Sequence, residues 1–303
     1  MKRLWILVLI AFAAGLAVGD ADAAKKKRKS RGSHSTSQST PADQRDSSTL
    51  CNGGVMITAD DQIKGCTALI ASGRLGRERR ATAYYNRGNG YVGKNDFGRA
   101  IDDYTEALSL RNGYVEALFN RAVAYRISGN AQAAVGDYST VLGFTPNDPD
   151  ALAGRGMAYV TLAKHDKALE DFNLAIALKP GHLGALTQRG HSFVRNHSWA
   201  QAIADYDAAI AIAHTNIEAY YGRGVAKIYS GDIPGGQSDM AAAQTLDTGI
   251  AARMTSQGIP PPQMLNAPPL PPIKRKEKEE EPRKDEGETT PDAKPEDKTA
   301  PPP

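Results

Sequence analysis

Residues 88–94 read GNGYVGK and carry the spacing of a phosphate-binding loop. Gly88, Gly90 and Gly93 form G-x-G-x-x-G, and Lys94 follows directly. The backbone N–H groups of such a loop can hold a phosphate when the loop joins a strand to the first turn of a helix. The surrounding sequence must therefore decide whether these glycines bind a nucleotide or allow two helices to pack closely.

A repeat of 34 residues runs through the middle of the chain and bears on this question. An arginine followed by Gly or Ala recurs five times at that interval. Further small and aromatic positions keep the same interval, so each unit has two apolar stripes at helical spacing, separated by a polar turn. We predict that the small residues let the first helix of a unit lie close to the second. The small residues are Gly88, Ala122, Gly156, Gly190 and Gly224 on the first helix and Ala100, Ala134, Ala168 and Ala202 on the second.

These columns resemble the tetratricopeptide repeat family, and more narrowly its exported bacterial members. The resemblance implies an all-α, right-handed helical solenoid of helix-turn-helix repeats, with a concave groove lined by the first helix of each unit. Gly90 and Gly93 do not recur in the other units and no strand pattern precedes them, so we predict that they lie on a helix. The five units span residues 81–114, 115–148, 149–182, 183–216 and 217–250.

Two charged columns accompany the repeat. An arginine precedes the small residue of every first helix, and an aspartate precedes the aromatic position of every second helix. We predict that they form ion pairs, within units or between neighbours, which fix the register of the helices. The columns are Arg87, Arg121, Arg155, Arg189 and Arg223, and Asp103, Asp137, Asp171, Asp205 and Asp239.

The two ends of a solenoid need caps, because each end unit has an unpaired apolar face. We predict an N-terminal capping segment over residues 51–80 and a partial C-terminal capping helix over residues 251–258, where a sixth unit begins and stops. Cys51 and Cys66 are the only cysteines. In an exported chain they would form a disulfide, which we favour, and in a cytosolic chain they would be two buried thiols.

The termini differ in composition from the repeats. Residues 1–23 have the order of a secretory signal peptide, with basic residues, an apolar run and a small-residue cleavage site. Residues 24–50 read as a basic and Ser/Thr-rich linker, and their six cations within 25–31 disfavour translocation. Residues 259–303 hold 13 of the 18 prolines and are predicted to be a disordered spacer. Because of the signal-peptide pattern, we expect a periplasmic or cell-envelope location. The alternative, which the cations favour, is a retained membrane anchor with the repeats on the cytoplasmic side.

The resemblance implies a protein or peptide partner, and the residues expected to face the groove are mostly apolar or aromatic. Four of them would form an exposed stripe, namely Tyr85, Phe119, Met157 and Tyr221, while Asn89 and Asn120 could bond to a peptide backbone. The alternative is that these side chains pack against neighbouring first helices. Tyr85 stands where acidic-tail-binding members of the family have a lysine, which favours a more neutral ligand. The candidate groove residues are Tyr85, Asn89, Phe119, Asn120, Val123, Met157, His191 and Tyr221.

Catalysis has little support in the sequence. The six histidines show no metal-ligand spacing, and no nucleophile stands beside a base. We expect no cofactor, no metal and no catalytic residue. The hypothesis is a non-enzymatic, protein- or peptide-binding scaffold of the cell envelope, periplasmic or secreted. The alternative is an envelope-surface binder that attaches through residues 25–31 to anionic lipid, polysaccharide or nucleic acid.

Overall fold

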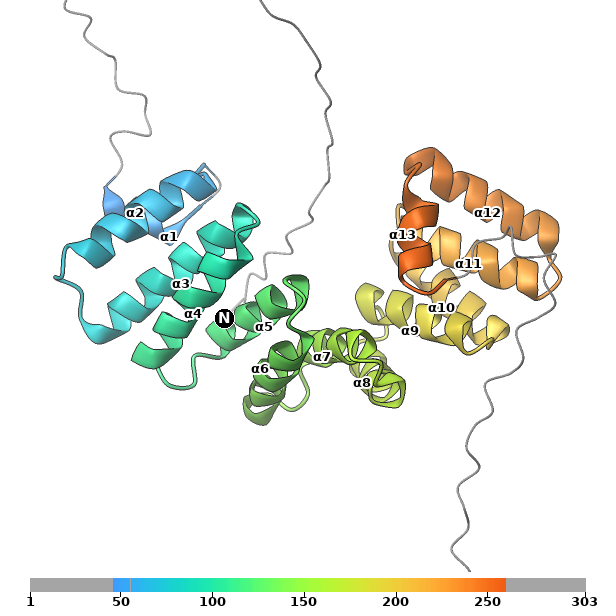
Figure 1. The fold of residues 1–303 in the computed structure, drawn as a ribbon, viewed down its shortest axis with the longest axis horizontal. Coiled ribbons are helices and arrows are strands. Elements are labelled where there is room, and N and C mark those ends of the chain that lie inside the picture. The colour runs from blue at the N-terminus through green and yellow to red at the C-terminus, as the bar shows by residue number, and fades with distance from the viewer. Residues whose placement is uncertain (1–45, 55, 260–303) are drawn as a thin grey trace, which may run out of the picture. The chain divides into compact units, whose positions relative to one another are not determined.

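The computed structural model describes residues 46–54 and 56–259, which contain thirteen α-helices and no strand (Figure 1). No helix in this described part combines the length and the apolar character that a membrane crossing requires. The predicted signal peptide, the basic segment 25–31 and all but the first residue of the 259–303 tail lie outside it. The helices are α1 (Ser47–Asn52), α2 (Ala59–Ala71), α3 (Arg77–Gly93), α4 (Phe97–Leu110), α5 (Val115–Ile127), α6 (Ala131–Phe144), α7 (Pro149–Thr161), α8 (His165–Leu178), α9 (Leu183–Arg195), α10 (Trp199–Ile212), α11 (Ile217–Tyr229), α12 (Ile233–Leu246) and α13 (Ile250–Ser256).

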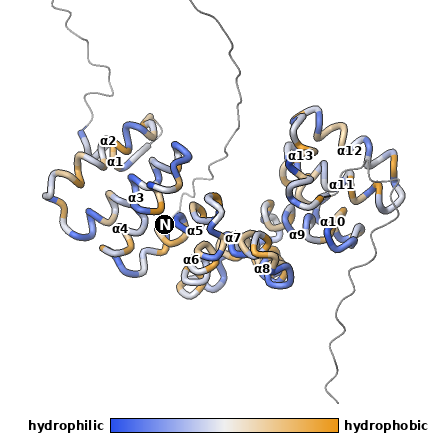
Figure 2. The backbone as a smooth tube through the Cα atoms, viewed as in Figure 1, coloured by the Kyte–Doolittle hydropathy of each residue, from blue (hydrophilic) through white to orange (hydrophobic). Residues whose placement is uncertain are grey.

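The ten helices α3–α12 form five consecutive helix-turn-helix units in the predicted order. Each first helix packs against the second helix of its own unit and against the second helix of the unit before it. Apolar and polar stretches alternate along these helices (Figure 2), as amphipathic helices require. The predicted all-helical solenoid is confirmed.

The small column is explained by close contact between the helices of a unit. A Cβ added at Gly88 would lie 2.7 Å from Cε1 of Tyr104, and one at Gly156 would lie 2.6 Å from Cε1 of Phe172. Gly90 faces α2, where an added Cβ would lie 2.9 Å from Cγ1 of Ile63. Gly88, Gly90 and Gly93 all lie on α3, so the G-x-G-x-x-G spacing is used for helix packing, as predicted.

The charged columns form five bidentate ion pairs within the units. Nε and Nη2 of each arginine on a first helix donate to the two carboxylate oxygens of the aspartate on the second, at 2.7–2.9 Å. The remaining nitrogen, Nη1, donates to a side chain on the preceding second helix; for Arg121 the acceptor is Oγ1 of Thr105 at 2.9 Å. Each arginine therefore joins three helices, and the predicted pairing is confirmed.

The turns inside the units share one backbone conformation. The second residue before every second helix has a positive φ, and only two of the five positions hold glycine. Asn tolerates this left-handed region better than most residues, whereas Ala gains nothing from it. The five residues are Asn95 (φ 57°), Gly129 (φ 87°), Ala163 (φ 55°), His197 (φ 58°) and Gly231 (φ 102°).

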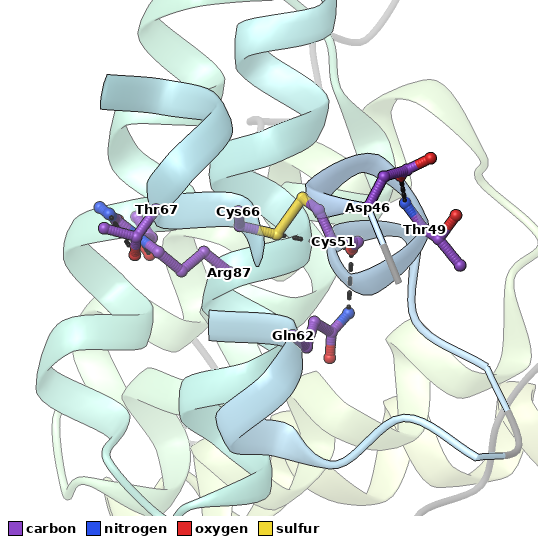
Figure 3. Close-up of a disulfide and its surroundings, with 8 residues drawn as sticks. Asp46, Thr49, Cys51, Gln62, Cys66, Thr67 and Arg87 are labelled. Atoms are coloured by element: carbon purple, nitrogen blue, oxygen red, sulfur yellow. Dashed lines mark hydrogen bonds and ion pairs between the residues drawn. A yellow bond between two sulfur atoms is a disulfide. The ribbon is translucent and has the colours of Figure 1, made fainter. Parts of the chain in front are cut away.

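The N-terminal cap consists of α1 and α2, joined by the Cys51–Cys66 disulfide (Figure 3). Both cysteines are buried, and Gly65 lets α1 approach so closely that an added Cβ would lie 2.5 Å from Cβ of Leu50. The predicted boundary between the linker (24–50) and the cap (51–80) was wrong. Because α1 begins at Ser47, the end of the predicted 24–50 linker belongs to the folded cap. Three serine and threonine residues in the six-residue helix hid its single buried leucine from the apolar pattern.

The C-terminal helix α13 does not continue the solenoid as the first helix of a sixth unit. It packs mainly against α11 and less against α12, and Figure 1 shows it turned across α11 instead of running alongside α12. Beyond its end, the carbonyl oxygen of Gln257 accepts a hydrogen bond from Nη1 of Arg195 on α9, at 2.9 Å. The partial capping helix is present, but it folds back over two units.

Replacing Ala163 with glycine should stabilise the protein. The substitution removes the strain of a left-handed Ala, which destabilises the folded state by roughly 1–2 kcal/mol. Glycine also raises the conformational entropy of the unfolded chain, which offsets roughly 0.4–1 kcal/mol of that gain. We expect the free energy of unfolding to rise by about 0.5–1 kcal/mol in urea titrations. Gly129→Ala, at the equivalent turn, is the matched control and should lower it; equal effects of the two variants would contradict the explanation.

Candidate binding face

Two positions on every first helix define what we call the first-helix face, and their exposure changes along the chain. In the first three units five of the six side chains are partly exposed, and Ala153 is buried. In units four and five all four side chains are buried. The face consists of Tyr85 and Asn89, Phe119 and Val123, Ala153 and Met157, Thr187 and His191, and Tyr221 and Val225.

The aromatic side chains of the first two units lie on aromatic rings beneath them. The ring centroid of Tyr85 is 5.9 Å from that of Tyr104 and 5.1 Å from that of Tyr114, and the centroid of Phe119 is 5.6 Å from that of Tyr138. The sequence left open whether these side chains are exposed or packed against neighbouring helices. Each ring is packed on one side and partly exposed on the other, so both apply. The rings are held in place and still present apolar surface.

A hydrogen-bonded network joins these rings to the two asparagines. The hydroxyl of Tyr104 donates to Oδ1 of Asn89 at 2.7 Å. Nδ2 of Asn120 donates to the same oxygen at 2.9 Å and to the hydroxyl of Tyr85 at 3.2 Å. Within the described part of the chain, Oδ1 of Asn120 accepts no hydrogen bond.

The tyrosine hydroxyls in and beside this network stay protonated at neutral pH. Burial raises the pKa of the Tyr85 and Tyr104 hydroxyls, and burial with the nearby Tyr85 raises the pKa of Tyr114 to about 12. Tyr114 was missed in the sequence, although a signal was present. It occupies a helix-capping position that holds Asp148, His182 and Asn216 in the later units, so an aromatic residue there is unusual.

The expected exposure of His191 and Tyr221 was wrong, since both side chains are fully buried. His191 is the unit-four counterpart of Asn89, and its ring centroid lies 5.7 Å from that of Tyr206. Among the described residues, neither ring nitrogen of His191 has a hydrogen-bond partner, and the hydroxyls of Tyr206 and Tyr221 have none. Burial, with a contribution from Arg195, lowers the pKa of His191 to about 3.

A second histidine, His182, has a structural role. His182 is the N-cap of α9, where its Nδ1 accepts from the backbone N–H of Ala185 at 3.0 Å and its Nε2 lies 3.0 Å from Oδ1 of Asp150. This contact lowers the pKa of Asp150. No group of three His, Cys, Asp or Glu residues in the described ranges is placed to hold a metal ion.

Comparison with known proteins matches this architecture. Sequence models of the tetratricopeptide repeat match residues 85–149 and 149–182. A tetratricopeptide repeat protein from Parabacteroides merdae ATCC 43184 is 19% identical, with a TM-score of 0.54 over 66% of this chain and 84% of that chain. MamA from Desulfovibrio magneticus RS-1 is 17% identical, with a TM-score of 0.51 over 57% of this chain and 98% of that chain. No curated protein sequence matches the chain.

The buried His191 should make stability depend on pH. Its pKa is about 3 in the folded state and about 6.5 when unfolded, so the unfolded state binds more protons between these values. The stabilisation is complete above pH 6.5 and is lost as the pH falls. We expect wild type to lose about 2 kcal/mol more than His191→Asn between pH 7 and pH 5, in denaturant titrations at both pH values. An identical loss in the two proteins would show that His191 is not a buried neutral group.

Proposed function

The chain is a tetratricopeptide repeat protein, and we propose that it is a non-enzymatic scaffold that binds a peptide or protein segment on the first-helix face of its first three units. Repeats of this family are protein-interaction scaffolds, and the proposal assigns that role to particular side chains. The residues are Tyr85, Asn89, Phe119, Val123 and Met157 of that face, together with the neighbouring Asn120, and they would line the concave groove that the family resemblance implies.

The observation that carries the proposal is the pairing of anchored rings with unused amide atoms. Tyr85 and Phe119 are held by rings beneath them, so little rotamer entropy is lost when a ligand covers them. Oδ1 of Asn120 can accept from a peptide N–H, and an N–H of Asn89 can donate to a peptide carbonyl. The six residues are uncharged, which favours a neutral stretch of the partner.

The double substitution Tyr85→Ala with Phe119→Ala tests the face. Peptides selected from a displayed library against the full chain would be measured by fluorescence anisotropy on each variant. We expect binding to be at least tenfold weaker, about 1.4 kcal/mol, because both anchors are lost. Phe144→Ala is the control, since that ring is 57% exposed and lies at the end of a second helix. Unchanged affinity in the double variant, with its helical circular dichroism intact, would place binding elsewhere.

We also propose that the protein is exported to the cell envelope. The disulfide between Cys51 and Cys66 supports this, because such bonds form and persist in oxidising compartments. The signal-peptide pattern of residues 1–23 supports it as well, while the cations of 25–31 oppose it.

The cations of 25–31 could instead attach the protein to an anionic surface. In that case its binding to the surface should depend strongly on salt, and deleting residues 25–31 should remove this binding.

Intact mass spectrometry of the protein from its bacterial host, with and without reductant, tests export. We expect a chain that starts at Ala24 and gains two hydrogens on reduction, because cleavage follows Ala23 and one disulfide is opened. A full-length chain with free thiols would mean that the signal is retained and the repeats lie on the cytoplasmic side. The same measurement on Cys66→Ser is the control for the second mass difference.

A further inference from the structure

The last ten described residues, 250–259, pack mainly on α11, the first helix of unit five. Ile250, Met254 and Ile259 are each 0% exposed and share one apolar cluster with Tyr221 and Val225, the two face positions of that unit. Equivalent positions in the first three units remain partly exposed except at Ala153. The unit-five face is therefore buried where this segment is present.

Polar contacts hold the segment in place at its two ends. Arg253 lies 2.7 Å from Asp247 and 3.7 Å from Glu218 on α11. At the other end Arg195 donates to the carbonyl of Gln257, and the positive φ of Gly258 (78°) turns the chain so that Ile259 enters the cluster. The segment is therefore seated at a defined place on the face and is anchored to both α9 and α11.

Several buried polar groups of units four and five are not matched in their hydrogen bonds. The hydroxyls of Tyr206 and Tyr221 and both nitrogens of His191 have no partner among the described residues, and Oε1 of Gln257 has none either. The corresponding atoms around Asn89 in the first unit are bonded to one another. Buried polar groups without partners destabilise a contact, so the segment fits the face through its apolar side chains and not through its polar groups.

We propose that residues 250–259 occupy this part of the binding face as an intrachain substitute for a partner segment, which displaces them. The partner that fits is a short amphipathic helix with apolar side chains four positions apart, as Ile250 and Met254 are, which also offers a hydrogen bond to the hydroxyl of Tyr221. This inference deepens the proposed function and rests on it for the identity of the face. The occupied unit-five face belongs to the same series of first helices as the open face formed by Tyr85, Phe119 and Met157.

The test uses a fluorescent peptide of residues 248–259 and the full chain with Met254→Asp. The introduced carboxylate should release the segment from the apolar cluster, and the peptide should then bind at least tenfold more tightly than it binds wild type. Wild type binds weakly because the attached segment competes at high effective concentration. Ala252→Asp is the matched control, since Ala252 is exposed on the same helix, and it should behave as wild type.

Hydrogen exchange on the same variants distinguishes the outcomes. We expect α13 of wild type to exchange at least a hundredfold faster than α11, and Met254→Asp to lose protection only in α13 and on the face beneath it.

Loss of protection throughout α9–α12 would show that α13 is an integral cap and would overturn the inference. An absence of saturable peptide binding to a folded Met254→Asp chain would also overturn it. A wild-type dimer that Met254→Asp converts to monomer would assign the segment to a second copy, which also overturns it. Failure of Tyr85→Ala with Phe119→Ala to affect ligand binding would remove the proposed function without changing these readouts.

Discussion

The bidentate arginine–aspartate pair is the interaction on which the rest of the solenoid depends. A guanidinium that uses two nitrogens on one carboxylate fixes both distance and orientation, and its third nitrogen reaches the preceding unit. The next residue along the first helix is the small one that touches the second helix, and the one after that belongs to the first-helix face. Three consecutive residues, such as Arg87, Gly88 and Asn89, therefore set the register, the helix contact and the first-helix face in turn.

Because the framework is repeated so strictly, the five units can differ at the face without changing the fold. The position of Asn89 holds Val123, Met157, His191 and Val225 in the later units. In the first unit it is part of a bonded network, and in the fourth it is a buried imidazole without a hydrogen-bond partner among the described residues. The chemistry of the face thus changes along the chain while the packing beneath it stays the same, as is usual in repeat proteins.

Much of this could be predicted from the sequence, because the information is local and repeated. The small column, the ion pairs and the function of the Gly88–Gly93 spacing all follow from comparing one unit with the next. The disulfide was expected for an exported chain, because the sequence has only two cysteines and places both in the cap. The burial of Tyr221 could not be found in this way, since Tyr221 shares its cluster with Ile250, Met254 and Ile259, which depart from the repeat. Nor does the repeat pattern distinguish His191, whose buried ring lies near that of Tyr206. Helix α1 could not be predicted from the sequence either, because its single buried leucine gives no periodic signal.

The disulfide has a consequence for the order in which the solenoid comes apart. In a quasi-one-dimensional array each unit is stabilised by its immediate neighbours, so a covalent closure strengthens only the end that contains it. Here that end is the N-terminal one, and among the described residues the opposite end is closed by a seven-residue helix without a side-chain cap. Thermal fraying should therefore run toward the amino terminus, giving the molecule a direction in which its units melt, and the units nearest Cys51 and Cys66 are the last to lose their structure.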